Sequence, residues 1–264
     1  MGTSRSAGEF TVLLTACIAP KVGIREHLRR ADPVARERDY AEALRFWLEL
    51  NEPRIGGIVF ADNSGQSLDK LRQIARHCSA GRRPVEFLSW DFPPPRMDLS
   101  YGHSEFLLVN KAVEASELIH GSRYFIKATG RYRFPAIQRL LRRLPADFHV
   151  AVDSKGFRPF GLKSQPMSPV ALALFDREYY TQHLAQLPAA MVPAPPWDRR
   201  QFVETVLFDQ LYPQRADPRL ILRWPCNCEP LGIGANGDNY SSRGKAVQRL
   251  LRAVSRRLWP SLWI

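Results

Sequence analysis

A cluster of basic residues surrounds one glycine near the middle of the chain. Lys127, Arg131 and Arg133 place three cations around Gly130, with Tyr132 in the same short segment. Glycine lets the backbone approach a ligand closely, and a guanidinium offers a forked donor that fits phosphate oxygens. These residue types therefore predict a diphosphate-binding site. A surface strand end with scattered basic residues is the alternative interpretation.

The elements that flank this cluster predict where it lies. Residues 124–128 have the composition of a short buried strand, and a helical pattern opens after them at Phe134. In an open α/β sheet, ligands bind at the carboxyl edge of the strands, because glycine turns, helix N-termini and loop side chains converge there. We therefore expect the basic cluster at that edge.

Polar residues follow two further predicted strands. Asp62 and Asn63 end a strand over residues 55–61 and can hydrogen-bond a base or a ribose, although their sequence is also ordinary turn chemistry. Asp153 follows a strand over residues 148–152. Two carboxylates at separate strand ends can serve different roles, one for ligand hydroxyls and one for proton transfer.

The start of a helix predicted from residue 101 supplies three more candidates. Gly102, His103 and Glu105 stand there, where backbone N–H groups can face phosphate or sugar hydroxyls. We predict that they contact a donor sugar or an acceptor. The alternative is that Ser104 or Glu105 only caps the helix.

An acidic residue interrupts the apolar side of a later helix. This helix is predicted over residues 199–211 with Asp198 as its cap, and Glu204 lies close in angle to Leu207 and Leu211. Burial would raise the pKa of Glu204 and let it act as a base. A structural ion pair is the alternative.

Apolar runs and helical patterns alternate along most of the chain. The predicted strands are residues 10–18, 55–61, 84–89, 124–128, 148–152 and 219–224. Helical patterns over residues 32–51 and 172–187 are among those between them, and a glycine-rich loop over residues 225–237 is a candidate lid. The alternation predicts an α/β fold with a mainly parallel sheet flanked by helices.

The end of the chain predicts a basic amphipathic helix. From residue 243 onward every charged residue is Lys or Arg, apolar residues recur at helical spacing, and tryptophans follow. Such a helix fits the interface of an anionic bilayer. The alternative is a terminal helix that docks on the core and leaves its arginines in solvent.

The overall charge of the chain indicates the sign of the charge that a binding partner carries. Lys and Arg exceed Asp and Glu by 12, which favours phosphates, anionic lipid or nucleic acid. The four cysteines are few and their spacing does not match a zinc site, so we interpret them as reduced thiols of a cytosolic protein. No run approaches the about 18 apolar residues of a membrane span, and the first residues lack a signal core.

Together these features resemble the nucleotide-sugar-dependent glycosyltransferases of the GT-A type, and more narrowly the bacterial proteins of lipopolysaccharide, O-antigen or capsule synthesis. The segments that carry the resemblance are residues 62–64, 101–105, 125–132, 202–204 and the glycine-rich stretch before the basic tail. The resemblance implies a GT-A-like catalytic domain over residues 1–242 and a tail over residues 243–264 that contacts an anionic membrane. It also implies a nucleotide-sugar donor, a glycan or lipid-linked acceptor, and a place on the inner face of the cell membrane.

The sequence departs from typical GT-A enzymes at the metal site. These enzymes carry Asp-x-Asp at the end of a central strand, where the carboxylates hold a divalent ion against the donor diphosphate. No Asp-x-Asp occurs here, and Thr129, Gly130 and Arg131 stand at the corresponding position. Fixed cations can neutralise a departing nucleoside diphosphate, so we expect Lys127 and Arg131 to do so without metal or other cofactor.

The resemblance also assigns roles to the carboxylates. A carboxylate takes the proton of the acceptor hydroxyl in an inverting transferase. This role favours Glu204 as the base, with Asp153 as its competitor, and Asp62 is assigned to the nucleoside. Two other classes of function stay open: a nucleic-acid-binding protein, disfavoured because no recognised motif is present, and an inactive membrane-associated scaffold with a transferase fold.

Overall fold

The protein is built on a seven-stranded sheet with strand order β3-β2-β1-β4-β6-β5-β7. The computed structural model describes residues 8–21, 28–79, 83–96, 98–156, 166–193, 201–234, 237–240 and 242–258. The strands are β1 (Phe10–Ala16), β2 (Ile55–Asp62), β3 (Val85–Ser89), β4 (Tyr124–Thr129), β5 (Val150–Ala151), β6 (Leu172–Asp176) and β7 (Leu220–Ile221). β6 runs antiparallel to β4 and β5, whereas the other strand pairs are parallel. The carboxyl ends of β1, β2, β3 and β4 therefore share one edge.

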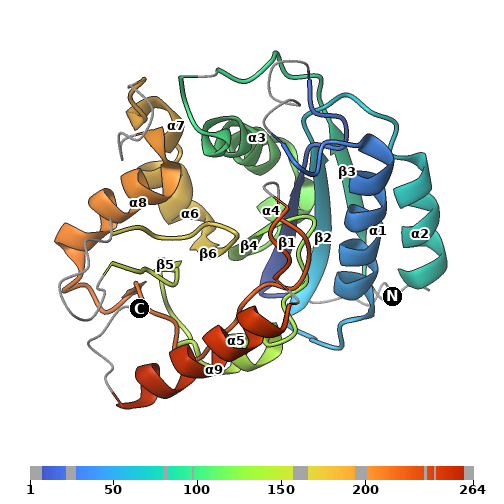
Figure 1. The fold of residues 1–264 in the computed structure, drawn as a ribbon. Coiled ribbons are helices and arrows are strands. Elements are labelled where there is room, and N and C mark those ends of the chain that lie inside the picture. The colour runs from blue at the N-terminus through green and yellow to red at the C-terminus, as the bar shows by residue number, and fades with distance from the viewer. Residues whose placement is uncertain are drawn as a thin grey trace, which may run out of the picture.

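Helices cover both faces of this sheet (Figure 1). They are α1 (Pro33–Glu49), α2 (Asp69–Ser79), α3 (Tyr101–Ala115), α4 (Glu117–His120), α5 (Ile137–Arg143), α6 (Arg177–Tyr179), α7 (Leu187–Ala190), α8 (Val203–Leu211) and α9 (Arg243–Leu258), with a π-helix η3 (Tyr180–Leu184) and a 3₁₀-helix η5 (Tyr212–Gln214). The core cluster with residues of α1, α2 and α5 lies on one face, and the cluster with residues of α3, α7 and α8 lies on the other. The expected α/β fold with a basic C-terminal helix is confirmed.

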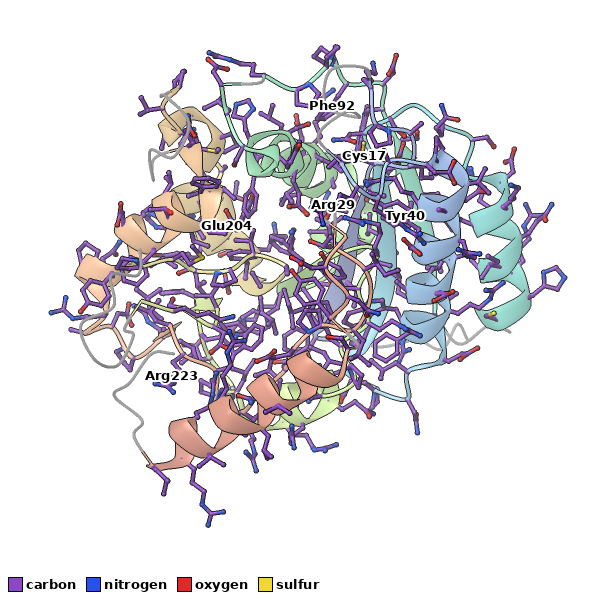
Figure 2. All side chains as sticks on the ribbon, in the orientation of Figure 1. Cys17, Arg29, Tyr40, Phe92, Glu204 and Arg223 are labelled. Carbon is purple, nitrogen blue, oxygen red and sulfur yellow. The ribbon has the colours of Figure 1, made fainter. Side chains whose placement is uncertain are left out.

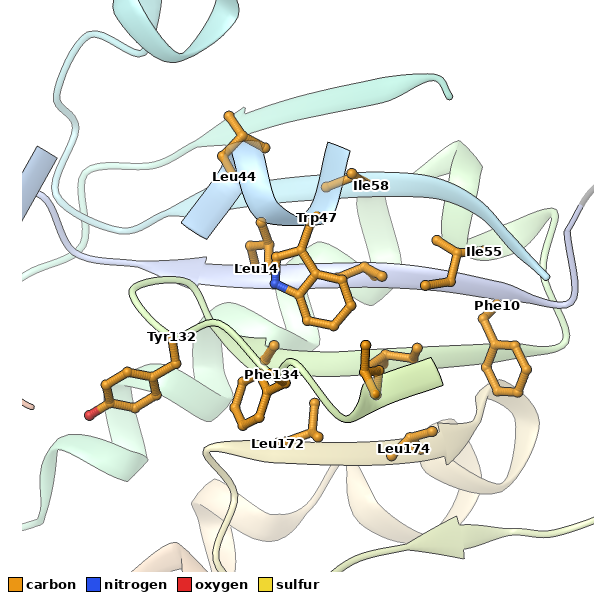
Figure 3. Packing of buried hydrophobic residues seen from close by; sticks show 14 of the residues in the cluster. Phe10, Leu14, Leu44, Trp47, Ile55, Ile58, Tyr132, Phe134, Leu172 and Leu174 are labelled. Carbon is orange, nitrogen blue, oxygen red and sulfur yellow. The ribbon is translucent and has the colours of Figure 1, made fainter. Parts of the chain in front are cut away.

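The central strand β1 is buried because its side chains alternate between these two cores. Leu14 packs with Leu44 and Trp47 of α1 on one face, as Figure 3 shows, and Leu13 joins the core on the other face. All four side chains are fully buried. Burial of a side chain of this size contributes about 1.5–3 kcal/mol. The packing fixes the position of the loop that follows β1.

One predicted helix is partly wrong. Residues 172–187 have a helical pattern, but β6 occupies Leu172–Asp176, and helical turns begin only at Arg177. Leu172 pairs with Ala128 of β4, and four of the five β6 residues are buried because cores cover both faces. A short strand without polar alternation cannot be distinguished from a buried helix by its pattern.

Other boundaries differ by a few residues. β7 is shorter than the strand expected over residues 219–224, and β5 is shorter than residues 148–152. α8 begins at Val203, and Asp198, its predicted cap, lies outside the described residues. The helix expected from residue 32 is confirmed, with Asp32 accepting a hydrogen bond from the Ala35 N–H at 2.9 Å.

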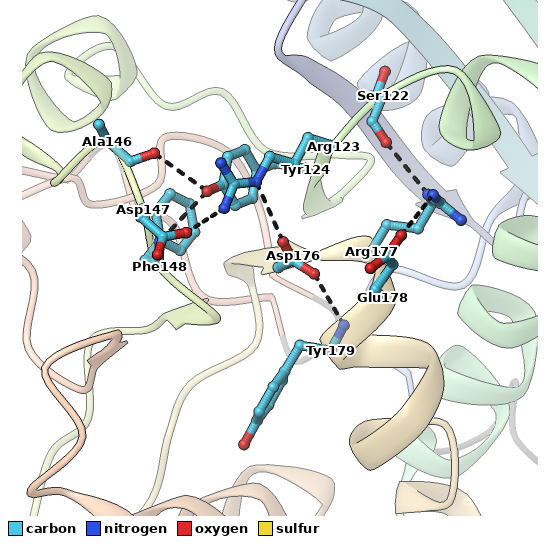
Figure 4. A network of polar contacts seen from close by, with 10 residues as sticks. All are labelled: Ser122, Arg123, Tyr124, Ala146, Asp147, Phe148, Asp176, Arg177, Glu178 and Tyr179. Carbon is cyan, nitrogen blue, oxygen red and sulfur yellow. Dashed lines mark hydrogen bonds and ion pairs between the residues drawn. The ribbon is translucent and has the colours of Figure 1, made fainter.

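The edge opposite the strand carboxyl ends is closed by polar contacts. Arg123, just before β4, forms ion pairs with Asp147 and with Asp176 at the end of β6 (Figure 4). Asp176 also accepts a hydrogen bond from the Tyr179 N–H at 2.9 Å and so caps α6. These contacts hold β4 and β6 together at the edge away from the predicted site.

Candidate active site

A cavity of about 500 Å³ lies at the carboxyl edge of the sheet. Its wall comes from the ends of β1, β2 and β4, from α1, and from the first turns of α3 and α8. The predicted residues in this wall are Asn63, Gly102, Glu105, Arg131, Tyr132 and Glu204. The predicted residues outside it are Asp62, His103, Lys127, Gly130 and Asp153. The sequence therefore predicted the edge of the sheet at which the cavity lies, and the structure shows which of the candidate residues line this cavity.

Lys127 does not face a ligand, which corrects its expected role. Its side chain is fully buried, and its ammonium group donates to Glu105 Oε1 at 2.7 Å, to the Val170 carbonyl at 2.6 Å and to Thr129 Oγ1 at 3.3 Å. All three N–H donors of the ammonium are thus used within the protein. Lys127 neutralises Glu105 instead of a diphosphate.

Glu105 is held as a charged group in the cavity wall. Burial alone would raise the pKa of its carboxyl, but the Lys127 ammonium and hydrogen bonds from Lys127, Thr15 and Thr129 outweigh burial and lower the pKa below its ordinary value. The side chain is 25% exposed and all of these bonds reach Oε1. An anionic acceptor of hydrogen bonds is therefore fixed beside the cavity.

Replacement of Lys127 by methionine is expected to lower the free energy of unfolding by about 3 kcal/mol, because removal of one partner leaves the carboxylate of a buried pair without its counter-ion. Urea denaturation measures the change. The matched control is Lys70→Met, which breaks an ion pair with Glu37 whose lysine is 72% exposed. The free energy of unfolding of this control should fall by less than about 1 kcal/mol.

The decrease in the free energy of unfolding caused by Lys127→Met should become smaller at acid pH. Because the pKa of Glu105 is lowered in the folded protein, its stabilising contribution is present above its unfolded pKa and disappears as pH falls through the folded pKa. Equal losses in the Lys127 and Lys70 variants would show that the buried pair does not stabilise the fold as described.

Two buried arginines in the cavity wall do lack acidic partners. Arg131 is 6% exposed, its Nη1 donates to the Ile233 carbonyl at 3.0 Å, and its buried Nε has no hydrogen-bond partner. Arg36 is 5% exposed, and its partners among the described residues are the carbonyls of Cys17 and Arg30 and the Tyr40 hydroxyl, to which it donates. In the part of the chain that the structure describes, no carboxylate lies within 4 Å of either guanidinium.

A buried charge without a counter-ion is costly, so the two arginines favour an anion in the cavity. Arg36 stands in the first turns of α1 and is buried there, although the sequence analysis did not single it out. The sequence signal that could have found it is a cation in the first turns of a helix, where the helix dipole disfavours positive charge.

Glu204 lines the same cavity as these arginines. It belongs to α8, and in Figure 2 its label lies apart from those of Cys17 and Tyr40. Burial raises the pKa of the Glu204 carboxyl, the negative charge of Glu105 raises it further, and Lys127 opposes both. Among the described residues no cation lies within 4 Å of it, so the alternative of an ion pair is not observed there.

Gly102 brings the two glutamates to the same cavity. A Cβ atom at Gly102 would lie 2.4 Å from Val203 Cγ1, so only glycine lets the start of α3 pack this closely on α8. Glu105 then has a lowered pKa and Glu204 a raised pKa within one site. A pair of acids whose pKa values are shifted apart is typical of acid–base chemistry.

Asp62 and Asn63 have different positions at the end of β2. Asp62 is fully buried, and its carboxylate accepts hydrogen bonds from the Ile18 N–H at 2.9 Å and the Ser64 N–H at 2.8 Å. It therefore fixes the loop after β1 and does not reach the cavity. Asn63 lines the cavity, and its buried Oδ1 has no hydrogen-bond partner. This oxygen is an acceptor available to a ligand hydroxyl or amine.

Three other candidates, Gly130, His103 and Asp153, do not line the cavity. Gly130 donates its N–H to the Thr15 carbonyl at 2.8 Å, and a Cβ there would lie 2.8 Å from the same oxygen, so glycine serves packing on β1. His103 is not among the α3 residues that line the cavity. Asp153 binds the Arg256 guanidinium of α9 through both oxygens, at 2.9 and 2.8 Å. Asp153 is therefore not positioned to act as the base.

The glycine-rich segment packs against the turn after β4. Leu231 forms an antiparallel bridge with Arg133, and the Ile233 carbonyl accepts from Arg131. Tyr240 follows this segment, lines the cavity and packs edge-on against Tyr132, with ring centroids 5.4 Å apart. The segment thus orients Arg131, and its function as a lid stays a prediction.

Cys17 is a cavity residue that the sequence analysis did not single out. Burial raises the pKa of its thiol to about 11, although Arg36 lowers it in part. The thiol is therefore protonated at neutral pH, and a thiolate nucleophile is disfavoured at this position.

The residues at the end of β4 do not fit a divalent metal ion. They supply a threonine hydroxyl, a glycine and the Arg131 guanidinium, which would repel a cation. Within the described residues, no group of three His, Cys, Asp or Glu side chains converges. The Asp62 oxygens are occupied by the protein's own N–H and hydroxyl groups.

We compared the sequence and the fold with those of known proteins. No known family model matches the sequence, and no curated protein matches it. Over 97% of this chain, the structure is similar to 45% of the bifunctional glycosyltransferase WbbM, with a TM-score of 0.50 and 12% identity. The chain has a GT-A-like fold.

Two further solved structures are similar at lower scores. One is the mannosyltransferase PcManGT from Pyrobaculum calidifontis in complex with GDP-Man and Mn²⁺, with a TM-score of 0.46, 12% identity and coverage of 81% of this chain and 68% of that one. The other is a glycosyltransferase involved in glycosylation of the major capsid of PBCV-1, with a TM-score of 0.42, 13% identity and 80% coverage of each chain.

Proposed function

We propose that this protein is a glycosyltransferase that moves a sugar from a nucleotide-sugar donor to a glycan or lipid-linked acceptor, without a divalent metal ion. The observation that carries the proposal is the arrangement of charges in the cavity. Arg36 and Arg131 are buried without an acidic partner among the described residues, and Glu204, with a raised pKa, lines the same cavity. A GT-A-like fold around this cavity supports a nucleotide sugar as the anion.

We propose that the donor is held by polar groups of the cavity wall that keep hydrogen-bonding capacity beyond their contacts with the described residues. The diphosphate lies against the guanidinium groups of Arg131 and Arg36, which provide forked N–H donors. The nucleoside is bound near the end of β2, where Asn63 offers its free oxygen. Glu105, a carboxylate with a lowered pKa, accepts hydrogen bonds from sugar hydroxyls.

Transfer requires one proton transfer and one substitution. The acceptor oxygen forms a bond to the anomeric carbon of the sugar while its proton passes to the Glu204 carboxylate. The bond between the anomeric carbon and the diphosphate oxygen breaks, and the bonding electrons leave with the nucleoside diphosphate. Arg131 and Arg36 stabilise the negative charge that develops on this leaving group. A single displacement of this kind inverts the configuration of the sugar.

The biological setting is proposed from charge. A net charge of +12 favours an anionic surface such as the inner face of the cell membrane, and the resemblance of the sequence suggests bacterial surface polysaccharide synthesis as the pathway. Nucleic acid is disfavoured as the partner, because the two arginines are buried in a cavity that suits a small ligand.

Release of nucleotide from a panel of UDP-, GDP-, CMP- and dTDP-linked sugars in the presence of EDTA tests the proposal. We expect one donor class to be consumed, slowly with water and faster once an acceptor is added. Nucleotide binding without any turnover would identify an inactive scaffold. A salt-sensitive shift of short RNA or DNA, without binding of any nucleotide sugar, would identify a nucleic-acid-binding protein.

A further inference from the structure

The basic C-terminal helix is attached to the protein by its arginines. Arg252 of α9 forms an ion pair with Glu229 at 2.8 Å, and Arg256 binds both carboxylate oxygens of Asp153. Arg256 also donates to the Trp224 carbonyl. These ion-paired side chains are each less than one-fifth exposed. The side of α9 that faces the domain is therefore charged.

The aliphatic side of α9 faces solvent instead. Val247, Leu250, Val254 and Leu258 are 59%, 65%, 47% and 59% exposed, and their spacing places them in one row along the helix. We call this row the apolar stripe. Figure 1 shows α9 along the outside of the molecule. A helix that docks in the ordinary way would bury such a row against the core, so this orientation leaves an apolar surface uncovered.

We propose that the apolar stripe is a docking surface for a bilayer that contains anionic lipid. The charge of the helix identifies this occupant: residues 243–258 contain six Lys or Arg and no Asp or Glu, and only Arg252 and Arg256 of the six form the ion pairs with the domain described above. Arg257, next to Leu258 in sequence, is exposed and can reach a lipid phosphate. A helix with Val and Leu on one side and basic residues around them lies in the interface of an anionic membrane, with the aliphatic side chains among the acyl chains.

The attachment of α9 gives Asp153 a function. Asp153 follows β5, the last strand but one of the sheet, and its bond to Arg256 fixes α9 to that sheet. Docking of the stripe would therefore set the orientation of the whole domain on the membrane. Within the described residues, no helix combines the length and hydropathy that a membrane span requires. The docking proposal stands apart from the proposed transfer reaction, because it rests only on α9 and its contacts.

Sedimentation of the full chain with vesicles tests the proposal. We expect binding to vesicles of equal parts phosphatidylglycerol and phosphatidylcholine, and weak binding to phosphatidylcholine alone. Val247→Glu should reduce binding to the anionic vesicles by about tenfold or more, because it places a charge in the apolar stripe. The matched control is Val34→Glu, the same substitution at an exposed valine of α1, which should bind as the wild type does.

A second variant distinguishes the loss of apolar contact with the bilayer from the effect of an added charge. Leu250→Asn adds no charge and should also weaken vesicle binding, while nucleotide binding and the thermal melting temperature stay unchanged. Equal binding by Val247→Glu and Val34→Glu would overturn the proposal. The proposal would also be overturned if the wild type did not bind vesicles but formed dimers, and Val247→Glu disrupted these dimers. That result would assign the apolar stripe to a protein partner. Because nucleotide binding is measured separately, failure here would leave the proposed function untouched.

Discussion

Replacement of Arg131 by methionine is expected to lower kcat/KM for the nucleotide-sugar donor by about 10²- to 10³-fold, the range for loss of one preorganised group that stabilises developing charge. The guanidinium is 6% exposed, lines the cavity and keeps its Nε without a protein partner. Methionine retains much of the buried volume but cannot neutralise a diphosphate. Initial rates and calorimetric titration with the nucleoside diphosphate measure the two effects separately.

The control for this variant is Arg142→Met on α5, an exposed arginine outside the cavity. It should retain wild-type rates. Arg131→Lys keeps the charge but loses the forked geometry, and it should recover part of the affinity. If Arg131→Met melts as the wild type does and binds the nucleoside diphosphate equally well, the assignment of Arg131 to the leaving group is wrong.

Glu204→Gln is expected to lower kcat by about 10²- to 10⁴-fold while the affinity for the nucleotide sugar stays within a few-fold of the wild type, as for loss of a general base. Glutamine has nearly the same shape but cannot accept the proton of the acceptor hydroxyl. Single-turnover rates with saturating donor and acceptor measure the chemical step. Retained turnover would place the base on another residue of the cavity.

The pH dependence should follow the raised pKa of Glu204. Activity is expected to decline as pH falls through that pKa, at a higher pH than for an ordinary carboxyl, because the protonated acid cannot act as a base. The residual activity of Glu204→Gln should lack this acid limb. Since the folded pKa is raised, the ionised form opposes folding above it, and the glutamine variant should melt at a higher temperature than the wild type at neutral pH.

The parts of the fold that the sequence predicted are those set by local pattern. The unbroken apolar run over residues 10–18 indicated β1, and Asp32 with Pro33 indicated the start of α1. The site edge was predictable for a physical reason, since parallel strands end at one edge and the polar residues at Asp62 and Thr129 follow two of them.

The parts that the sequence did not predict depend on contacts between distant residues. Lys127 pairs with Glu105 on another element, and the sequence does not show that its ammonium is consumed by that contact. Asp153 and Arg256 are separated by 103 positions, so a strand-end carboxylate gave no sign that it binds the terminal helix. The helical pattern of α1 does not show that Arg36 is buried, and only the packed structure places it beside Cys17.

The central claim is that buried arginines, and no metal ion, bind the donor diphosphate. Thermal unfolding of the wild type with nucleoside diphosphates and monophosphates, each with EDTA or with Mn²⁺, tests it most directly. A diphosphate at about 100 times its Kd should stabilise the protein by about 2.7 kcal/mol, more than the monophosphate and equally with EDTA or Mn²⁺. Stabilisation that appears only with Mn²⁺, or none by any nucleotide, would contradict the account.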